Sequence, residues 1–485
     1  MILGINGQNH DSSLALIDGE EIVWAAHAER YSRVKNDNRL NLEMVKEMYE
    51  YGSPESIVWF ENPLTKSLRK LYSGQRPWWC NPKEELARVG LGHLPVEHVQ
   101  HHHSHAAAGF YTSNFSDASI LVVDAIGEWN TVSIWKATSY AGLEKVWSKN
   151  YPNSIGLFYT AMTQYLGLKP NEEEYILMGM AALGKPVIKE YFKKEYFKKF
   201  EGPDFKLRHN LHRGCQWWKN SAGISTVDIA ASVQAVMEEY LLKTAQWIKQ
   251  NLPSKNLIFM GGCALNCVAN SIIAKKAGFE NMWVMPNPGD AGSAIGAVAA
   301  VEKRPLYWKG PFLGTDIDRP LDIENIVNDL LKGKVVAVAN GRAEFGPRAL
   351  GNRSLLCDPR GKDAKLRMNQ LKKREEFRPF APAILEEHAD TYFDMPVKSS
   401  PYMQFVARCR LPDDFPGICH VDNTSRVQTV NHADNKNFRA ILELWYEKTG
   451  CPMLMNTSLN VKGEPLVNSL EDAVRWEQIN GVKVY

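Results

Sequence analysis

The chain has 485 residues, with 57 lysine and arginine and 55 aspartate and glutamate side chains, so its formal net charge is only +2. This balance gives no overall attraction to nucleic acid, and any such binding would depend on a local basic patch. The length predicts two or three domains, and no apolar stretch approaches the 18 residues of a membrane span. The eight cysteines form no CxxC pair, a pattern typical of reduced thiols, and we expect a cytoplasmic protein with no membrane partner.

The chain begins with a strand, a polar turn and a second strand. These segments are ILGIN, GQNHDSS and LALIDGEEIVWAA, and apolar runs bounded by turn residues are typical of core strands. A similar pattern recurs over residues 119–150, where ILVVDAIGEWN precedes TVSIWKA. The recurrence predicts a duplicated α/β nucleotide-binding core.

The histidine-rich run HHHSH at residues 101–105 is followed by three alanines, which favour a helix. His101 and His105 would then lie one helical turn apart, on the same face, where both imidazoles can bind one metal ion. The alternative is an exposed turn without a ligand. Asp124 ends the apolar run ILVV, and Asp290 lies in the turn NPGDAGSAIGA. Because two His and two Asp suit Fe, Mn or Zn, we predict that these four residues form a metal site.

Apolar residues recur at helical spacing from Thr226 to Ile248, which predicts a helix with one buried face. The strand that follows, over residues 256–262, ends in the double glycine of Gly261 and Gly262. Glycines there let backbone N–H groups approach a phosphate closely. A tight turn explains the two glycines equally well.

A second domain is expected beyond the Pro- and Gly-rich segment 303–318, starting with a strand at 334–339. Its most unusual motifs are GRAEFGPRALGNRS, LKKREEFRPFAP, HVDNTSRVQTV and NTSLNVKGEP. Arginine binds phosphate and carboxylate groups bidentately and stays charged. We therefore interpret the arginines of these motifs as parts of a polyanion pocket, the alternative being a set of solvated surface arginines.

Together these motifs resemble the NodU/CmcH carbamoyltransferase family, which includes the O-carbamoyltransferases of antibiotic biosynthesis. The similarity runs almost end to end and also rests on AERYSRVKND, HHHSHAAAGFY, EEEYILMGMAALG and FMGGCALNC. It implies an α/β protein with a duplicated actin-like (ASKHA) ATPase-fold domain over residues 1–305. A YrdC-like α/β domain would follow over residues 306–485.

The resemblance also implies a reaction and a set of site residues. The second domain would make carbamoyl-adenylate from carbamoyl phosphate and ATP, and the first would transfer the carbamoyl group to an acceptor hydroxyl. A divalent metal, iron in this family, would be bound by His101, His105, Asp124 and Asp290, and Mg²⁺ would accompany ATP. The nucleotide site would be lined by Gly261, Gly262 and Asn266. The phosphates and carbamate would be held by Arg342, Arg348, Arg353, Lys372, Arg374, Arg378, Arg426, Asn456, Ser458 and Asn460. His10 and Asp11 are candidates for a general base, or make only structural hydrogen bonds.

The acceptor is the least determined part of this interpretation. Segments 64–83 and 190–219 interleave Lys and Arg with aromatic residues, a mixture that can follow a phosphate backbone while stacking on bases. The stretch EYFKKEYFKK equally fits an amphipathic helix with buried aromatics, which we favour. The acceptor is expected to be a small molecule or nucleoside. The alternative is 5-hydroxymethylcytosine in DNA, which a duplex would have to present flipped out.

Two further questions stay open at this stage. An ASKHA-type kinase, which would use the first domain's ATP site directly, is the alternative from another class of enzyme. The arginine-rich second domain and the histidine pair argue against it. The sequence leaves the oligomeric state undetermined, a homodimer included.

Overall fold

The computed structural model describes residues 1–75, 81–220, 223–361 and 363–485. The chain divides into two compact units, one made of Met1–Ile22 and Ser53–Trp308, the other of Val23–Gly52 and Lys309–Tyr485. The break after Trp308 falls within the segment 303–318 that the sequence marked as a boundary. Residues 23–52 group with the C-terminal unit, which a division of the sequence at residue 305 does not anticipate.

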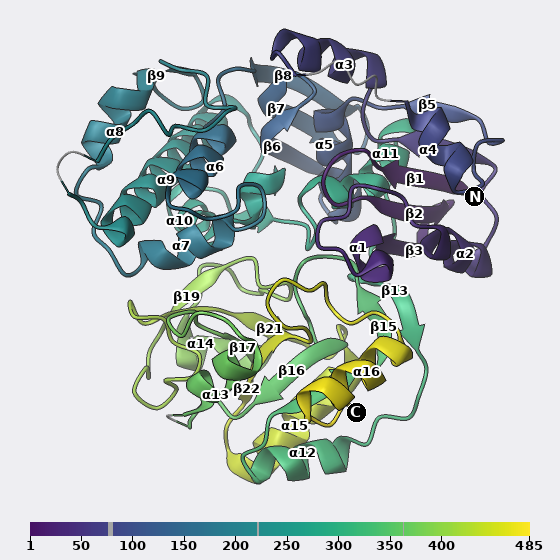
Figure 1. Cartoon of the computed structure of the whole chain (residues 1–485), viewed down its shortest axis with the longest axis vertical. Helices are drawn as coiled ribbons and strands as arrows, with labels where there is room; N and C mark the ends of the chain where they lie inside the picture. Colours follow the sequence, from purple (N-terminus) through teal and green to yellow (C-terminus); the bar gives the residue numbers. More distant parts are fainter. Residues whose placement is uncertain (76–80, 221–222, 362) are drawn as a thin grey trace. The chain divides into compact units, whose positions relative to one another are not determined.

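Two five-stranded sheets of the chain (Figure 1) have the same strand order. In one sheet the order is β3 (Glu21–His27), β2 (Ser13–Asp18), β1 (Ile2–Asn6), β4 (Ser56–Trp59) and β5 (Val96–His98). In the other it is β8 (Gly142–Asn150), β7 (Asn130–Thr138), β6 (Asp117–Gly127), β11 (Asn256–Met260) and β12 (Asn281–Trp283). Each central strand, β1 or β6, pairs antiparallel with the next strand of the chain and parallel with the strand on its other side. The two sheets therefore repeat one topology, as the recurring sequence pattern predicted.

One predicted strand is divided in two. The segment LALIDGEEIVWAA forms β2 and β3, with Gly19 at φ +59° in the turn between them. A left-handed backbone is cheap for glycine, which lets the chain reverse within two residues.

Two helices of the first unit cross from one repeat to the other. Helix α5 (His101–Thr112) follows β5 of the first sheet and packs against β6 and β11 of the second. Helix α11 (Ser293–Glu302) follows β12 of the second sheet and packs against β1, β2 and β4 of the first. The helices also pack against each other at Gly296, where an added Cβ would lie 1.9 Å from the carbonyl oxygen of Ser104. Glycine is required at this contact.

The remaining helices of the first unit are α3 (Pro63–Tyr72), α4 (Pro82–Arg88), α6 (Ile155–Tyr165), α7 (Glu174–Ala181), α8 (Lys189–Tyr196), α9 (Thr226–Asn251) and α10 (Cys267–Lys276). Helix α9 confirms the helix predicted from apolar spacing. The stretch EYFKKEYFKK is helical only to Tyr196 and continues as strand β9 (Phe197–Phe200), which pairs with β10 (Phe205–Leu207). Phe192, Tyr196 and Phe197 are buried, so these aromatic rings belong to the core.

The second unit is built on a mixed sheet in the order β14 (Val336–Ala339), β16 (Arg353–Cys357), β22 (Met453–Ser458), β17 (Ala381–Leu385) and β21 (Gln428–Val430). Alternate residues of its strands enter two separate apolar clusters, as the period-2 geometry of a strand buried on both faces requires. Helices α12 (Ile323–Leu331) and α15 (Lys436–Thr449) contribute to one cluster, and α13 (Ala364–Leu371) and α16 (Leu470–Asn480) to the other.

Smaller elements complete the second unit. Strands β13 (Phe312–Ile317) and β15 (Gly341–Glu344) form a pair, and β18 (Phe393–Asp394), β19 (Val406–Cys409) and β20 (Thr424–Arg426) form a three-stranded sheet. The short helices are α1 (Ala28–Ser32), α2 (Leu42–Tyr51) and α14 (Ala389–Tyr392). In the described part of the chain no helix is long and apolar enough to cross a membrane, and the seven cysteines there are free thiols.

Candidate active site

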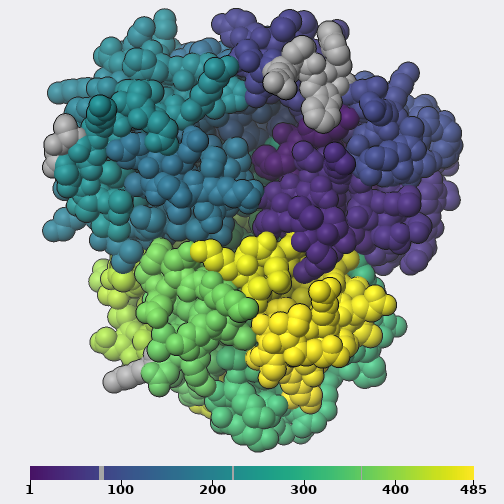
Figure 2. Space-filling view, viewed as in Figure 1, coloured from purple at the N-terminus to yellow at the C-terminus, as the bar shows by residue number. Residues whose placement is uncertain are grey.

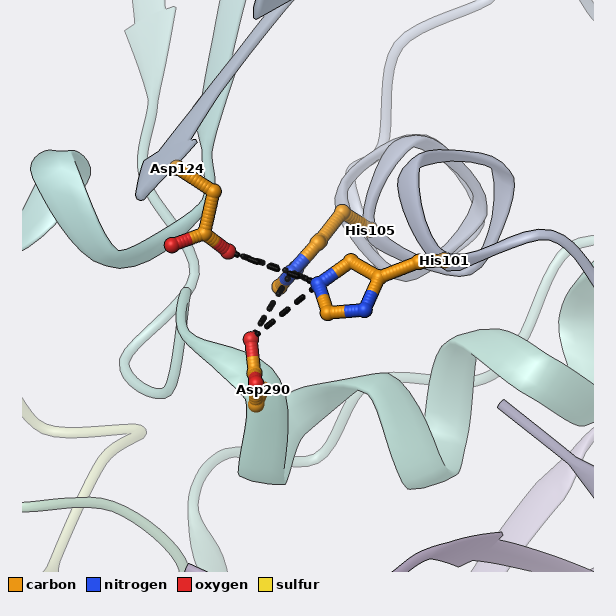
Figure 3. A group of neighbouring side chains, drawn as sticks. All are labelled: His101, His105, Asp124 and Asp290. Carbon is orange, nitrogen blue, oxygen red and sulfur yellow. Dashed lines mark hydrogen bonds and ion pairs between the residues drawn. The ribbon is translucent and has the colours of Figure 1, made fainter. Parts of the chain in front are cut away.

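Four side chains of the first unit converge at one buried point (Figure 3). His101 and His105 project from the first turns of α5, Asp124 from the end of β6, and Asp290 from the short 3₁₀ turn η2 (Asp290–Gly292) that leads into α11. The Nε2 atoms of the two histidines are 3.1 Å apart. His101 Nε2 lies 3.4 Å from Asp124 Oδ2 and 3.2 Å from Asp290 Oδ1, and the corresponding distances from His105 are 3.2 and 3.3 Å. The predicted four-residue cluster is therefore assembled by the fold.

These distances fit a single bound metal ion. Ligand bonds of about 2.0–2.1 Å in a tetrahedral site place neighbouring donor atoms roughly 3.3 Å apart, which is the separation found for the five measured pairs. Two imidazole nitrogens and two carboxylate oxygens are a donor set suited to Fe, Mn or Zn. The residues present thus fit the metal that the sequence predicted, without selecting among these ions.

The second nitrogen of each histidine is also engaged. His101 Nδ1 lies 3.5 Å from Glu61 Oε2, and His105 Nδ1 lies 3.1 Å from the hydroxyl of Ser293. Glu61 forms a buried ion pair with Lys66. Outer partners of this kind fix the ring orientation and leave Nε2 of each histidine free to bind a metal.

The ionisable side chains of the cluster shift one another's pKa values. Burial alone would raise the pKa of Asp290, but the charge of His101 and hydrogen bonds from His101 and His105 hold it well below its usual value. Burial would likewise lower the pKa of His101, yet Asp290 and Asp124 raise it well above the ordinary value. The carboxylates are therefore ionised, as metal binding requires, whereas His101 and His105 would have to release their protons before Nε2 of each could bind a metal.

The polar loop after β1 lies beside the same cluster. The side-chain amide of Asn9 donates a hydrogen bond of 2.5 Å to Asp290 Oδ2. Burial raises the pKa of Asp290, whereas His101, His105 and, less strongly, the charge of His10 lower it. His10 is exposed, whereas Asp11 has φ +65° and its carbonyl accepts a hydrogen bond from Asn6. His10 is thus the better placed of the two predicted general bases.

The predicted nucleotide residues after β11 have clear packing roles. Gly261 has φ +89°, and an added Cβ would lie 2.3 Å from the carbonyl oxygen of Val123. A Cβ at Gly262 would lie 3.1 Å from Asp124 Oδ1, so glycine keeps this side of the carboxylate uncovered. Asn266 caps α10 by accepting from the N–H of Ala269 and shares hydrogen bonds with Gln234.

In the second unit, three of the predicted residues, Lys372, Ser458 and Asn460, form a compact hydrogen-bonded group. Lys372 Nζ donates to the carbonyl oxygen of Ser458 (2.5 Å), to the Ser458 hydroxyl (3.0 Å) and to Asn460 Oδ1 (2.5 Å). Burial, followed by the charges of Arg374 and Arg378, holds the pKa of Lys372 well below its usual value. We call Lys372, Arg374, Arg378, Ser458 and Asn460 the lysine cluster. The lowered pKa means that burial and these arginines disfavour the ammonium form of Lys372, and a bound anion would favour it.

Two of the predicted arginines have structural tasks instead. Arg353 is fully buried, and its guanidinium donates to the backbone carbonyls of Asn468, Asn340, Gly341, Asn352 and Thr315. Arg342 donates to the carbonyls of Val23, Leu313 and Gly314 and lies over the ring of Tyr51. Their donors are directed at backbone rather than at a ligand, so we do not include them in the proposed site.

The other predicted residues of this unit have separate contacts. Arg374 donates to Asn369 and Pro379, and Arg378 to Glu375. Asn456 is buried and donates to Ala349 and Gln428. Arg348 and Arg426 are partly exposed.

Sequence reasoning missed Glu61, Asn9 and Glu128. Glu61 lies two residues after the apolar strand β4, much as Asp124 follows the apolar run ILVV, and this parallel could have identified it. Asn9 lies two residues before Asp11 in the polar loop already singled out. Glu128, at φ +54°, accepts hydrogen bonds from the backbone N–H groups of Asn62 and His101 and so fixes the starts of α3 and α5. Its capping role has no signature in the sequence.

The class of protein follows from comparison with known families. A family model described as the carbamoyltransferase N-terminus matches residues 85–299, and one described as the carbamoyltransferase C-terminus matches residues 327–484. Together they span most of the chain. They include the cluster of His101, His105, Asp124 and Asp290, which we call the metal-type cluster, and the lysine cluster. The chain belongs to the carbamoyltransferase family, in the NodU/CmcH type, and is a carbamoyltransferase enzyme.

Several individual proteins are similar to this chain over half of its length or more. It is 32% identical to the uncharacterized protein sll1178 of Synechocystis, over 98% of this chain and 93% of the relative. It is 32% identical to nodulation protein NolO of Bradyrhizobium diazoefficiens (78% of this chain, 75% of the relative) and 31% identical to 3'-hydroxymethylcephem-O-carbamoyltransferase of Amycolatopsis lactamdurans (54% of each). Among solved structures, full-length HypF aligns with 62% of this chain and 46% of its own, at 14% identity and a TM-score of 0.39, a similarity too low to argue from.

Proposed function

We propose that this enzyme is an ATP-dependent O-carbamoyltransferase that works through carbamoyl-adenylate. Carbamoyl phosphate and water would give carbamate and phosphate. A carbamate oxygen would then attack the α-phosphorus of ATP, releasing pyrophosphate. Finally an acceptor hydroxyl would attack the carbamoyl carbon, so that the C–O bond to AMP breaks and AMP leaves.

One observation carries this proposal. This member of the carbamoyltransferase family has the His101, His105, Asp124 and Asp290 cluster in one unit and the lysine cluster in the other. The lysine cluster offers an enclosed cationic environment for phosphate and carbamate, groups that are stabilised where water is excluded. The unit that contains it would be the YrdC-like, adenylate-forming part.

The first unit would carry out the transfer. His101, His105, Asp124 and Asp290 would hold a divalent metal, for which we propose iron on the family resemblance, and a metal there would act as a Lewis acid toward the bound anhydride. His10, exposed beside Asp290, is positioned to accept the proton of the acceptor hydroxyl. Gly262 keeps the approach to Asp124 free of a side chain. We expect the actin-like nucleotide site in this region.

Substitutions in each unit separate the two half-reactions. Lys372→Met should abolish carbamoyl-phosphate-dependent exchange of pyrophosphate into ATP, because the ammonium that meets the anions is gone, while Lys373→Met, at the exposed neighbouring lysine, should leave the exchange intact. His101→Ala should retain the exchange and lose carbamoyl transfer. Loss of the exchange in His101→Ala, or its retention in Lys372→Met, would contradict the assignment of the two units.

The kinase alternative is tested by the nucleotide product. A kinase of the ASKHA type transfers the γ-phosphate and leaves ADP, whereas adenylate chemistry leaves AMP and pyrophosphate. Chromatography of the nucleotides after incubation with carbamoyl phosphate, ATP and a panel of alcohols distinguishes the two. AMP that forms only with carbamoyl phosphate present is the expected result. Accumulation of ADP would contradict the proposal.

The DNA acceptor is the less favoured alternative. Its support was the mixture of basic and aromatic residues over 64–83 and 190–219. In the second segment Phe192 and Tyr196 are buried and Lys193 pairs with Glu239 and Glu190, whereas Tyr191 and Trp217 are exposed. Rings in the core are not available for stacking on bases. Residues 76–80 of the other mixed segment lie outside the described part of the chain.

A further inference from the structure

Two cysteines of the second unit lie against each other in its core. Cys409 is the last residue of β19, and Cys419 lies in the segment that leads into β20. Their exposed fractions are 2% and 8%, and both belong to the same apolar cluster. The thiol of each is a hydrogen-bonding partner of the other. We call Cys409 and Cys419 the thiol pair.

Backbone and hydroxyl contacts of β19 and β20 place the two thiols on the same side. The N–H of Cys409 donates to the carbonyl oxygen of Asn423 at 2.8 Å and so continues the antiparallel pairing of the two strands. From β20, the hydroxyl of Ser425 donates to the carbonyl oxygen of Ile418 at 2.9 Å and to Cys419 Sγ at 3.9 Å. The strand pair therefore holds Cys409 directly and Cys419 through Ser425.

The hydrogen bond within the thiol pair makes one thiol more acidic than the other. It lowers the pKa of Cys409 to about 7, although burial acts in the opposite direction. The same bond, together with burial, raises the pKa of Cys419. By contrast, burial raises the pKa of Cys215 and of Cys357 to about 11. Because the thiolate is the reactive form of cysteine, Cys409 combines a nucleophile with a second thiol in contact with it.

The segment between the two cysteines lies at the surface. Leu411 is 43% exposed, and the side chains of Asp413 and Asp414 are also exposed. In Figure 2 this part of the chain is yellow-green and forms part of the surface of the second unit, and Figure 1 labels β19 at its start. A local opening of this loop is enough to admit an oxidant as small as hydrogen peroxide.

A covalent bond within the thiol pair would act on β20. A disulfide brings two sulfur atoms closer than a hydrogen bond does. Gly417 has little room to follow, because its N–H donates to the carbonyl oxygen of Pro359 at 3.1 Å and an added Cβ would lie 2.6 Å from Cε of Met455. With Cys419 fixed from this side, the movement falls on β19 and β20. Strand β20 ends at Arg426, one of the residues expected to hold the phosphates and carbamate.

We propose that the thiol pair is a peroxide-sensitive switch whose disulfide form displaces β20 and weakens anion binding in the second unit. The Cys409 thiolate attacks one oxygen of hydrogen peroxide, the O–O bond breaks, hydroxide leaves and a sulfenic acid forms. The sulfur of Cys419 then attacks the sulfur of the sulfenic acid. The S–S bond forms, and the hydroxyl group leaves with the proton of Cys419 as water. Two thiols are oxidised to one disulfide, which a dithiol reductant converts back.

Peptide mass spectrometry of the whole protein after mild peroxide treatment tests the bond. We expect a peptide linked through Cys409 and Cys419 that has lost two hydrogen atoms and that dithiothreitol separates again. The link should be absent from Cys409→Ala and should still form in Cys451→Ala, a matched control at a buried cysteine of the same apolar cluster. A wild-type protein that forms no such link would overturn the proposal.

Alkylation of the reduced, folded wild type gives a measurement that needs no variant. Iodoacetamide at pH 7 should label Cys409 before Cys357, since only the former has a lowered pKa. Labelling in the reverse order would contradict the role of Cys409 as the attacking thiol.

The effect of the switch rests on the proposed function, whereas formation of the bond does not. Pyrophosphate exchange dependent on carbamoyl phosphate should fall when the wild type is oxidised, recover with dithiothreitol, and resist peroxide in Cys409→Ala. Unchanged exchange in a protein whose thiol pair is fully linked would show that the bond is no switch. If the reduced wild type has no exchange activity, the proposed function fails, and the mass measurement still decides whether the thiol pair forms a disulfide.

Discussion

Replacing Glu61 by Gln should affect stability and metal binding through two different partners. The carboxylate of Glu61 is buried, pairs with Lys66 through Oε1 and faces His101 Nδ1 through Oε2. Glutamine keeps the shape of the side chain but removes its charge. Lys66, itself only 3% exposed, would then lose its counter-charge and keep only neutral acceptors, the carbonyl oxygen of Gln8 and the new amide oxygen.

The two effects have separate expected sizes. Removing one partner of a buried ion pair leaves an uncompensated charge and costs about 3–5 kcal/mol in unfolding free energy. Loss of an outer partner of a metal-binding histidine weakens metal affinity by about 10- to 100-fold. The first effect should largely disappear in the double variant Glu61→Gln/Lys66→Met, because no charge remains buried. The second should persist, since His101 Nδ1 still faces a neutral amide.

Urea unfolding followed by tryptophan fluorescence, with a chelator present, measures the stability effect. Titration of Fe²⁺ or Zn²⁺ against a competing chelator dye measures the affinity. The expected pattern is a strongly destabilised single variant, a double variant of recovered stability, and weakened metal binding in both. Wild-type metal affinity in the double variant would refute the role assigned to Glu61, and an unchanged stability of the single variant would refute the buried ion pair.

Three further substitutions test the packing and electrostatics of the two units. Gly296→Ala should lower stability by about 1–3 kcal/mol, despite the helix-forming preference of alanine, because its Cβ would meet the Ser104 carbonyl at 1.9 Å; Gly289→Ala, with open space around it, should be close to neutral in the same thermal melts. Arg353→Lys should cost about 3 kcal/mol or more in denaturant unfolding, since one ammonium cannot satisfy five carbonyls that are buried or partly buried, whereas the surface substitution Arg360→Lys should cost little. Glu239→Gln should cost about 1 kcal/mol at pH 7, because Glu239 pairs with Lys189, Lys193 and Lys243. Burial opposes the pKa shift of Glu239, but these lysines lower it to about 2, so the stability difference should be full above pH 4.5 and shrink as the pH falls toward 2; a difference independent of pH would show that charge is not the cause.

The metal-type cluster was predictable because its ligands follow local rules. His101 and His105 are spaced by one helical turn, and Asp124 and Asp290 occupy the end of a strand and the start of a helix, positions that an α/β fold brings to one edge. The repeated strand order was likewise visible as a recurring pattern. These features depend on periodicity, which a sequence displays directly.

Other features depend on which groups a folded backbone leaves unsatisfied. The arginines of GRAEFGPRALGNRS look alike in sequence, yet Arg353 is surrounded by backbone carbonyls and Arg348 is partly exposed. The grouping of residues 23–52 with the second unit arises from contacts such as Tyr31 with Thr315 and Arg30 with Gly346, far apart in the chain. No local pattern distinguishes a guanidinium that binds backbone from one that binds a ligand.

The two repeats share one topology but contribute different groups to the metal-type cluster. His101 and Asp290 occupy equivalent places in the two repeats, each at the start of the helical segment that follows the fifth strand of its sheet. The central strands β1 and β6 also end in equivalent loops, both with non-glycine residues at positive φ, Asp11 in one and Glu128 in the other. The second loop follows Asp124, which supplies a carboxylate to the cluster, whereas the first contributes only the amide of Asn9 as a hydrogen-bond donor to Asp290. Among the polar side chains of the first loop, His10 is exposed, and its charge contributes to the lowered pKa of Asp290.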